Sequence, residues 1–258
     1  MSATDDVWKS PEADAAPAAE STPTPLGGSD DPTEVPKAVW ADFTSHPVPY
    51  ILANLGYMGI ATVFTFALLT IMGIGVAPGI VTEDDTILLV GLAAGFSVYM
   101  LGIFFLAFIA VPLWSASMLR GLDRQRRGEG TIGFASSFND MKPRAAGVIG
   151  TYALTQALVF VGIFLFYIPG LIAMAVGTFA LPIAVFEDVG PMEAWKRAWH
   201  HASSHAAWHI GVFALLFMAL IALELTLVGL LFIWPLMCAW QLYAYRLAFG
   251  EEGSTPTS

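Results

Sequence analysis

Charged residues are scarce in this sequence. Only 12% of its 258 residues are Asp, Glu, Lys or Arg, while 56% are hydrophobic; a soluble domain carries about 25% charged residues. A chain with so little charge has too few polar side chains to cover a water-soluble globule, so the composition indicates an integral membrane protein. Nine of the 21 acidic residues precede residue 43, so the net charge of -10 mainly describes a tail, and nothing predicts a nucleic-acid partner.

Cysteine and catalytic motifs are scarce as well. The one cysteine, Cys238, lies in an apolar run, which excludes an intramolecular disulfide and a thiolate metal site. The sequence lacks a P-loop, GxSxG, HExxH and the dinucleotide fingerprint. Its start, MSATDDVWKS, lacks the regions of a cleaved signal peptide, so we expect the first membrane helix to direct insertion. We therefore predict that the protein is not an enzyme and holds no cofactor or metal.

The order of polar and apolar segments predicts one membrane domain between two tails. Residues 1–36 are acidic and rich in Pro and Ala, a composition typical of disorder. Residues 37–250 contain apolar runs long enough to cross a bilayer, which takes about 20 helical residues, and residues 251–258 form a short tail. The six predicted spans are 50–76, 87–118, 147–167, 171–186, 207–229 and 231–249. Their continuous apolarity favours helices over a barrel, and predicts an all-α, six-helix transmembrane bundle.

Basic residues near the ends of membrane helices stay preferentially in the cytoplasm. With six spans, all 11 basic residues fall on one side: Lys9, Lys37, Arg120, Arg124, Arg126, Arg127, Lys142, Arg144, Lys196, Arg197 and Arg246. The first external turn carries only the acids Glu83, Asp84 and Asp85. This distribution predicts that both termini are cytoplasmic.

A weak internal repeat accompanies the spans. Each predicted hairpin follows a short aromatic segment: VWADFTSHPVPY, IGFASSFNDMKPR and PMEAWKRAWHHASSHAAW. Pro112 and Pro182 occupy similar positions in the outgoing helices of the first two hairpins. We interpret the pattern as three units, each an interfacial helix on the cytoplasmic side plus a hairpin.

The segment from Met192 to His209 is a candidate interfacial helix. At 100° per residue, one sector holds Trp195, Trp199, Ala202 and Ala206, and the other side holds Lys196, Arg197 and His200. Indole rings at headgroup depth and cations near anionic lipid are typical of a helix lying in the membrane interface. The alternatives are a lead-in helix that only sets the direction of the fifth span, and a helix that recognises a particular headgroup or partner.

Three histidines form a stripe beside this sector. His201, His205 and His209 recur at i, i+4 and i+8, next to His200. Such imidazoles could share a metal ion, sense pH near 6, or lie at a headgroup boundary without any ligand. No cysteine or aspartate in the segment completes a metal site, so we predict none.

Polar residues inside the predicted spans are the second group of candidates. Glu224 is the only acid deep in a span, and Gln156 and Gln241 are its possible polar neighbours. An ionisable residue in hydrocarbon is costly, which makes a proton or substrate role one reading and a structural hydrogen bond the other. Small residues such as Gly91, Gly95, Gly147 and Gly150 allow close helix contacts, within the chain or in an oligomer.

Residues 169–208, PGLIAMAVGTFALPIAVFEDVGPMEAWKRAWHHASSHAAW, carry a family resemblance. An apolar helix with an internal proline, an acidic exit, Gly-Pro and an Ala-x-Lys-Arg-Ala-Trp helix resemble the membrane domain attached to some bacterial glycerophosphoryl diester phosphodiesterases. The resemblance covers roughly residues 130–250. It implies a six-helix bundle in a bacterial inner membrane and no chemistry, since the reaction in that family belongs to a separate soluble barrel.

Two main functional hypotheses follow. The first is a non-enzymatic multi-pass protein that organises membrane lipids or partner proteins, in a homo-oligomer or with another membrane protein. The second is a transporter or channel for a small or lipidic substrate, based on Glu224, Gln156, Gln241 and the prolines at 112 and 182. A membrane-embedded enzyme acting on lipid is a third hypothesis, and the scarcity of intramembrane His, Asp and Glu disfavours it.

Overall fold

The computed structural model describes residues 31–130, 134–226, 229 and 232–250. All regular structure in these residues is helical, which confirms the predicted all-α class. The helices are α1 (Glu34–Ser45), α2 (Pro47–Thr82), α3 (Asp85–Phe105), η2 (Leu106–Ala110), α4 (Val111–Arg126), α5 (Phe134–Met141), η3 (Lys142–Arg144), α6 (Ala145–Phe186), α7 (Pro191–Ser204), α8 (Ala206–Glu224) and α9 (Ile233–Phe249). Most of the predicted tail 1–36 and all of the tail 251–258 lie outside the described residues, and α1 begins at Glu34, within the predicted tail.

Four helical stretches are long and apolar enough to cross a membrane: Pro47–Thr82, Asp85–Arg126, Phe138–Phe186 and Ala206–Glu224. In the most apolar 18-residue segment of the first stretch, Pro47–Thr82, only 6% of the residues are buried inside the protein. Apolar surface that the protein itself leaves uncovered needs a non-aqueous environment. These helices therefore indicate a membrane protein.

The count of four differs from the six predicted spans for two physical reasons. The third and fourth predicted spans correspond to the two arms of α6, which are separated by a break in the helical backbone at Phe166 (φ -157°, ψ 107°), just before Pro169, and which count as one stretch among the four. The sixth predicted span corresponds to α9, which has only 17 residues and carries the buried Arg246 in its last turn.

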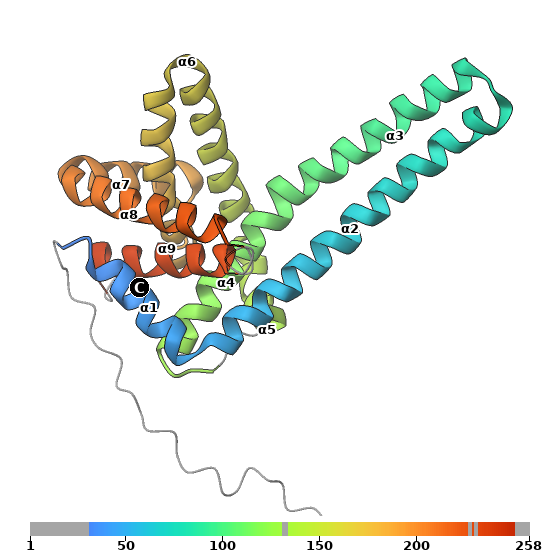
Figure 1. Cartoon of the computed structure of the whole chain (residues 1–258). Helices are drawn as coiled ribbons and strands as arrows, with labels where there is room; N and C mark the ends of the chain where they lie inside the picture. Colours follow the sequence, from blue (N-terminus) through green and yellow to red (C-terminus); the bar gives the residue numbers. More distant parts are fainter. Residues whose placement is uncertain (1–30, 131–133, 227–228, 230–231, 251–258) are drawn as a thin grey trace, which may run out of the picture.

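The α6 kink folds the helix into a hairpin, visible in Figure 1. Glycine makes the close approach of its two arms possible. A Cβ on Gly162 would collide with the backbone of Gly170, and a Cβ on Gly177 would collide with Thr155. The two arms thus lie against one another through backbone and small side chains.

A second hairpin is formed by α2 and α3. Gly91 packs on the backbone of Gly75, and Gly95 packs on Met72, so the glycines predicted for close packing do bring the helices together. The tip turns at Glu83, whose φ is 54°, and Asp84 caps α3 by accepting hydrogen bonds from the amides of Thr86 and Ile87. The acids predicted for an external turn therefore lie at the end of this hairpin.

The two hairpins do not lie side by side as spans in a bundle do. Figure 1 shows the α2–α3 hairpin and the α6 hairpin projecting in diverging directions from the other helices. The buried core lies at their base, around α9 and the second arm of α6. At the base, η2 widens the helix just before Pro112, which lacks the amide hydrogen that an α-helix uses.

Basic residues from distant parts of the sequence gather at the end of α6. Arg120 and Arg144 both donate hydrogen bonds to the carbonyl oxygen of Val185, at 2.8 and 3.1 Å. The fully buried Arg246 donates to both carboxylate oxygens of Asp123, at 3.1 and 2.8 Å. Helices α4, η3 and α9 each contribute an arginine to this region, so basic residues that are far apart in the sequence lie close together in the structure.

Candidate functional site

The helix predicted from Met192 to His209 is two helices in the structure. Pro191 occupies the first turn of α7, where its missing amide hydrogen costs nothing. His205 ends α7 and precedes α8 with a non-helical backbone (φ -124°, ψ 43°). The prediction of one continuous helix was wrong, because the chain changes direction at His205.

The two tryptophans of the predicted sector lie in different environments. Trp195 is 9% exposed, and its indole Nε1 donates a hydrogen bond to Oγ1 of Thr155 in α6 at 3.0 Å. Trp199 is 52% exposed. The expectation that both rings face the membrane interface is therefore corrected for Trp195, which packs with Ala194 and Ala198 against the protein core. A 40° separation on the helix suffices to place one ring under α6 and the other outside.

The two cations of α7 also differ. Arg197 donates to Glu193 at 2.8 Å and to Glu187 at 2.5 Å, and these hydrogen bonds raise the pKa of Arg197 above its ordinary value. The bond from Arg197 in turn lowers the pKa of Glu193. Lys196 is exposed and forms no ion pair with any described residue. The α7 cation available to an external anion is therefore Lys196.

The histidines cluster where α7 meets α8. His201 Nδ1 and His209 Nε2 are 2.6 Å apart, and the ring of His205 stacks on His201 with centroids 4.6 Å apart. Burial, followed by the neighbouring His205, lowers the pKa of His201. Within the described part of the chain, no group of three or more His, Cys, Asp or Glu residues is arranged to hold a metal ion. The nitrogen atoms of His201 and His209 face one another, in the geometry of a direct hydrogen bond.

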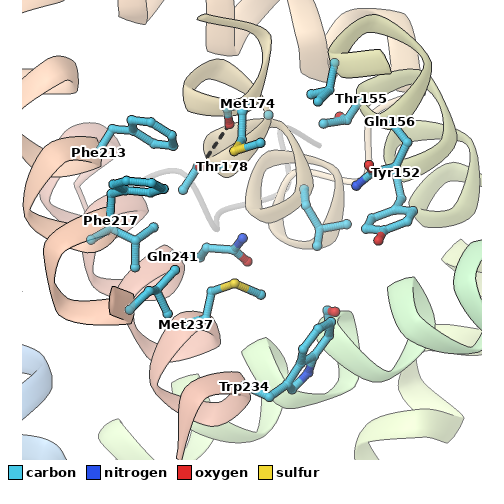
Figure 2. A pocket seen from close by; sticks show the side chains of 16 residues that line it. Tyr152, Thr155, Gln156, Met174, Thr178, Phe213, Phe217, Trp234, Met237 and Gln241 are labelled. Atoms are coloured by element: carbon cyan, nitrogen blue, oxygen red, sulfur yellow. Dashed lines mark hydrogen bonds between the residues drawn. The ribbon is translucent and has the colours of Figure 1, made fainter. Parts of the chain in front are cut away.

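Gln156 and Gln241 line one pocket, whereas Glu224 does not. Figure 2 shows the two amides entering the pocket from α6 and α9. Glu224 is exposed at the end of α8. The pairing of the two glutamines with Glu224, which was the stated basis for a proton or substrate role, is therefore corrected.

The pocket has a volume of about 260 Å³ and lies among α4, both arms of α6, α8 and α9. Its other lining residues are Ser115, Tyr152, Thr155, Val159, Met174, Gly177, Thr178, Leu181, Phe213, Leu216, Phe217, Leu220, Trp234 and Met237. Gln241 Oε1 and Trp234 Nε1 are buried, and neither has a hydrogen-bond partner in the part of the chain that the structure describes. The pocket is thus apolar with a few unpaired polar atoms.

Sequence reasoning missed most of this lining, although helical spacing contains the signal. Tyr152, Gln156 and Val159 share one face of α6, and Trp234, Met237 and Gln241 share one face of α9. Residues at i, i+3, i+4 and i+7 share a helix face. A search of each span for polar residues at that spacing would have found both faces.

No family model, curated protein or solved structure matches the chain. The resemblance of residues 169–208 to the phosphodiesterase-associated membrane domain thus stays a likeness of sequence pattern.

Proposed function

We propose that this chain is a non-enzymatic multi-pass protein of a bacterial inner membrane, where it organises lipid or partner proteins through its interfacial helices. In this proposal the chain crosses six times, through α2, α3 with α4, the two arms of α6, α8 and α9. The short helices α1, α5 and α7 lie on the cytoplasmic side with both termini. The resemblance described above, with its implied absence of catalysis, is part of the same proposal.

One observation carries the proposal, the division of α7 into a fixed face and a free face. Trp195 is held to α6 by its hydrogen bond to Thr155, so the helix has a defined orientation on the protein. Trp199 and Lys196 are both exposed, and Glu193, the carboxylate whose pKa the charge of Lys196 lowers, forms its hydrogen bond with Arg197. An exposed indole beside an exposed cation suits the headgroup region of an anionic bilayer.

The test compares the lipids that surround the full-length protein with those of the bulk membrane. Protein is extracted in native nanodiscs, and lipids and co-purifying proteins are identified by mass spectrometry. We expect enrichment of anionic lipid or of a specific partner, and a loss of that enrichment in Lys196→Glu and Trp199→Ala. Phe164→Ala removes another exposed aromatic ring, 83% exposed on α6, and serves as the matched control. No enrichment and no partner in the unmodified protein would contradict the proposal.

Transport of a small or lipidic substrate is the second candidate function. The pocket shared by Gln156 and Gln241 supports it, since uncharged polar groups inside a helical membrane protein are typical of substrate paths. Proteoliposomes that move a fluorescent alkyl glycoside, which is uncharged and has one chain, between leaflets would reveal such activity. We expect Gln156→Leu and Gln241→Leu to reduce it and Glu224→Ala, outside the pocket, to leave it unchanged. Absence of movement of this probe in the unmodified protein would contradict transport through this pocket.

A further inference from the structure

The pocket among α6, α8 and α9 is lined only by side chains that are uncharged at neutral pH. None of its 16 lining residues is Asp, Glu, Lys, Arg or His. A charged group brought into such a site would lose its hydration without gaining a counter-ion, which costs several kcal/mol. The occupant that fits this lining is therefore uncharged.

Two unpaired polar atoms show that the site is not purely apolar. Among the described residues, Gln241 Oε1 has no donor and Trp234 Nε1 has no acceptor. The hydroxyls of Ser115 and Thr178 each donate to a carbonyl oxygen of their own helix, so neither donates to Gln241. Buried polar atoms without partners are rare and costly. A ligand with an O–H or N–H group would satisfy Gln241, and an oxygen on the ligand would satisfy Trp234.

The size and outline of the pocket indicate one narrow chain. Its volume of about 260 Å³ lies below the range of roughly 300–1,000 Å³ found for pockets that enclose a drug-sized ligand. Figure 2 shows Phe213 and Phe217 on one side and Met174 and Met237 near the polar groups. Aromatic rings and flexible thioethers pack well against an alkyl chain. Two acyl chains would need more room than this.

The opening of the pocket faces the apolar outside of the protein. Phe217 of α8 and Met174 of α6 line the pocket and are 53% and 37% exposed. Both belong to stretches that are apolar enough to cross a membrane. A ligand would thus enter from the lipid phase.

We propose that this pocket binds a single-chain, uncharged amphiphile taken from the membrane, with its hydroxyl or amide group hydrogen-bonded to Gln241. This site is distinct from the free face of α7, so its test does not depend on the proposed function. Lys196→Glu and Trp199→Ala leave occupancy of the pocket unchanged.

The experiment uses the full-length protein in phosphatidylcholine nanodiscs and a dodecanol that bears a photoreactive diazirine in its chain. Mass spectrometry locates the crosslinks. Competition with dodecanol, dodecane, dodecanoate and dodecyltrimethylammonium then varies only the head of the ligand. We expect crosslinks in α8 and α9, displaced by dodecanol at least about fivefold more effectively than by dodecane or either charged chain, since one hydrogen bond is worth about 1 kcal/mol. Equal competition by dodecane, or stronger competition by a charged chain, would overturn the proposal.

Substitutions of two lining residues, Leu220 and Gln241, locate the site, with Met218→Trp as a control. Leu220→Trp fills the pocket from α8 and should abolish crosslinking, while Met218→Trp on the outer side of the same helix, 68% exposed, should retain it. Gln241→Leu replaces the amide with an apolar side chain of similar size. In this variant dodecanol and dodecane should compete about equally for the pocket. Melting temperatures identify any variant that has lost its fold. If Leu220→Trp does not fold, Gln241→Leu still tests the site, because it introduces no bulky residue. Crosslinking that persists in folded Leu220→Trp would also overturn the proposal.

Discussion

Trp195 of α7 donates its indole N–H to the hydroxyl oxygen of Thr155 in α6, across 3.0 Å. Thr155 is itself a lining residue of the pocket, and its hydroxyl donates to the carbonyl of Thr151. A helix on the outside of the protein and the wall of an internal pocket therefore share one hydroxyl group.

Trp195→Phe tests that contact. The substitution keeps an aromatic ring in the buried position and removes the donor, so we expect the free energy of unfolding to fall by about 1 kcal/mol. Thermal unfolding in detergent, followed by circular dichroism, gives the measurement. Trp199→Phe is the matched control, because the exposed ring forms no such bond, and it should leave the melting temperature unchanged. Equal effects of the two variants would show that the bond contributes nothing.

Asp123→Asn tests the buried ion pair with Arg246. Arg246 is fully buried and donates to both oxygens of Asp123, so neutralising the acid leaves an uncompensated guanidinium inside the protein. We expect a loss of about 3–5 kcal/mol of stability, measured by denaturant unfolding or by the yield of folded protein. Asp140→Asn breaks the more exposed pair with Arg124 and should cost less than about 1 kcal/mol. A larger effect at Asp140 would contradict this assignment.

Acidification should open the junction between α7 and α8. The pKa of His201 lies below the ordinary value of 6.5 because of burial and the neighbouring His205, so the unfolded chain binds the proton more tightly than the folded one. The stabilisation is thus complete above pH 6.5 and is lost as the pH falls through the lower folded pKa. Charge on His200 also lowers the pKa of His201, and a backbone hydrogen bond with Ala248 raises it by less than burial and His205 lower it.

Hydrogen–deuterium exchange of the amides around residues 201–209 measures this opening between pH 7.5 and pH 5. We expect exchange, corrected for its intrinsic pH dependence, to rise as the pH falls. His201→Gln should weaken the pH dependence of the corrected exchange, whereas His200→Gln, a substitution of an exposed neighbour, should leave the dependence as it is. A junction equally protected at both pH values would refute the prediction.

Gly91→Ala should separate the two helices of the α2–α3 hairpin. The added Cβ would collide with the backbone oxygen of Gly75, which cannot rotate away, so we expect a loss of about 1–3 kcal/mol. Gly59→Ala, in α2 with open space around it, is the control and should not destabilise the protein. Unfolding in detergent compares the two.

Apolar runs and helix breakers predicted much of the helical layout. The break in α6 falls just before Pro169, between the third and fourth predicted spans, and Gly91 and Gly95 lie in the α2–α3 contact as expected. These features are local, since proline and glycine act on their own backbone and on the nearest helix. The same locality explains why the composition sufficed to predict membrane helices.

The errors concern relations between distant segments. A helical projection of residues 192–209 placed Trp195 and Trp199 in one environment, but the packing of α7 against Thr155 of α6 decided which ring is buried. The pairing of Gln156 with Gln241 was anticipated, while the inclusion of Glu224 was not upheld, because the last turn of α8 extends beyond the pocket. Diverging hairpins likewise depend on tertiary contacts at their base that periodicity does not encode.

Cysteine accessibility in sealed membrane vesicles tests the membrane topology most directly. Single cysteines replace Glu129, Trp199 and Asp84 in turn, with the buried Cys238 changed to serine. An impermeant maleimide should label positions 129 and 199 from the same side of the membrane and position 84, at the tip of the α2–α3 hairpin, from the other. Labelling of positions 129 and 199 from opposite sides would contradict the account.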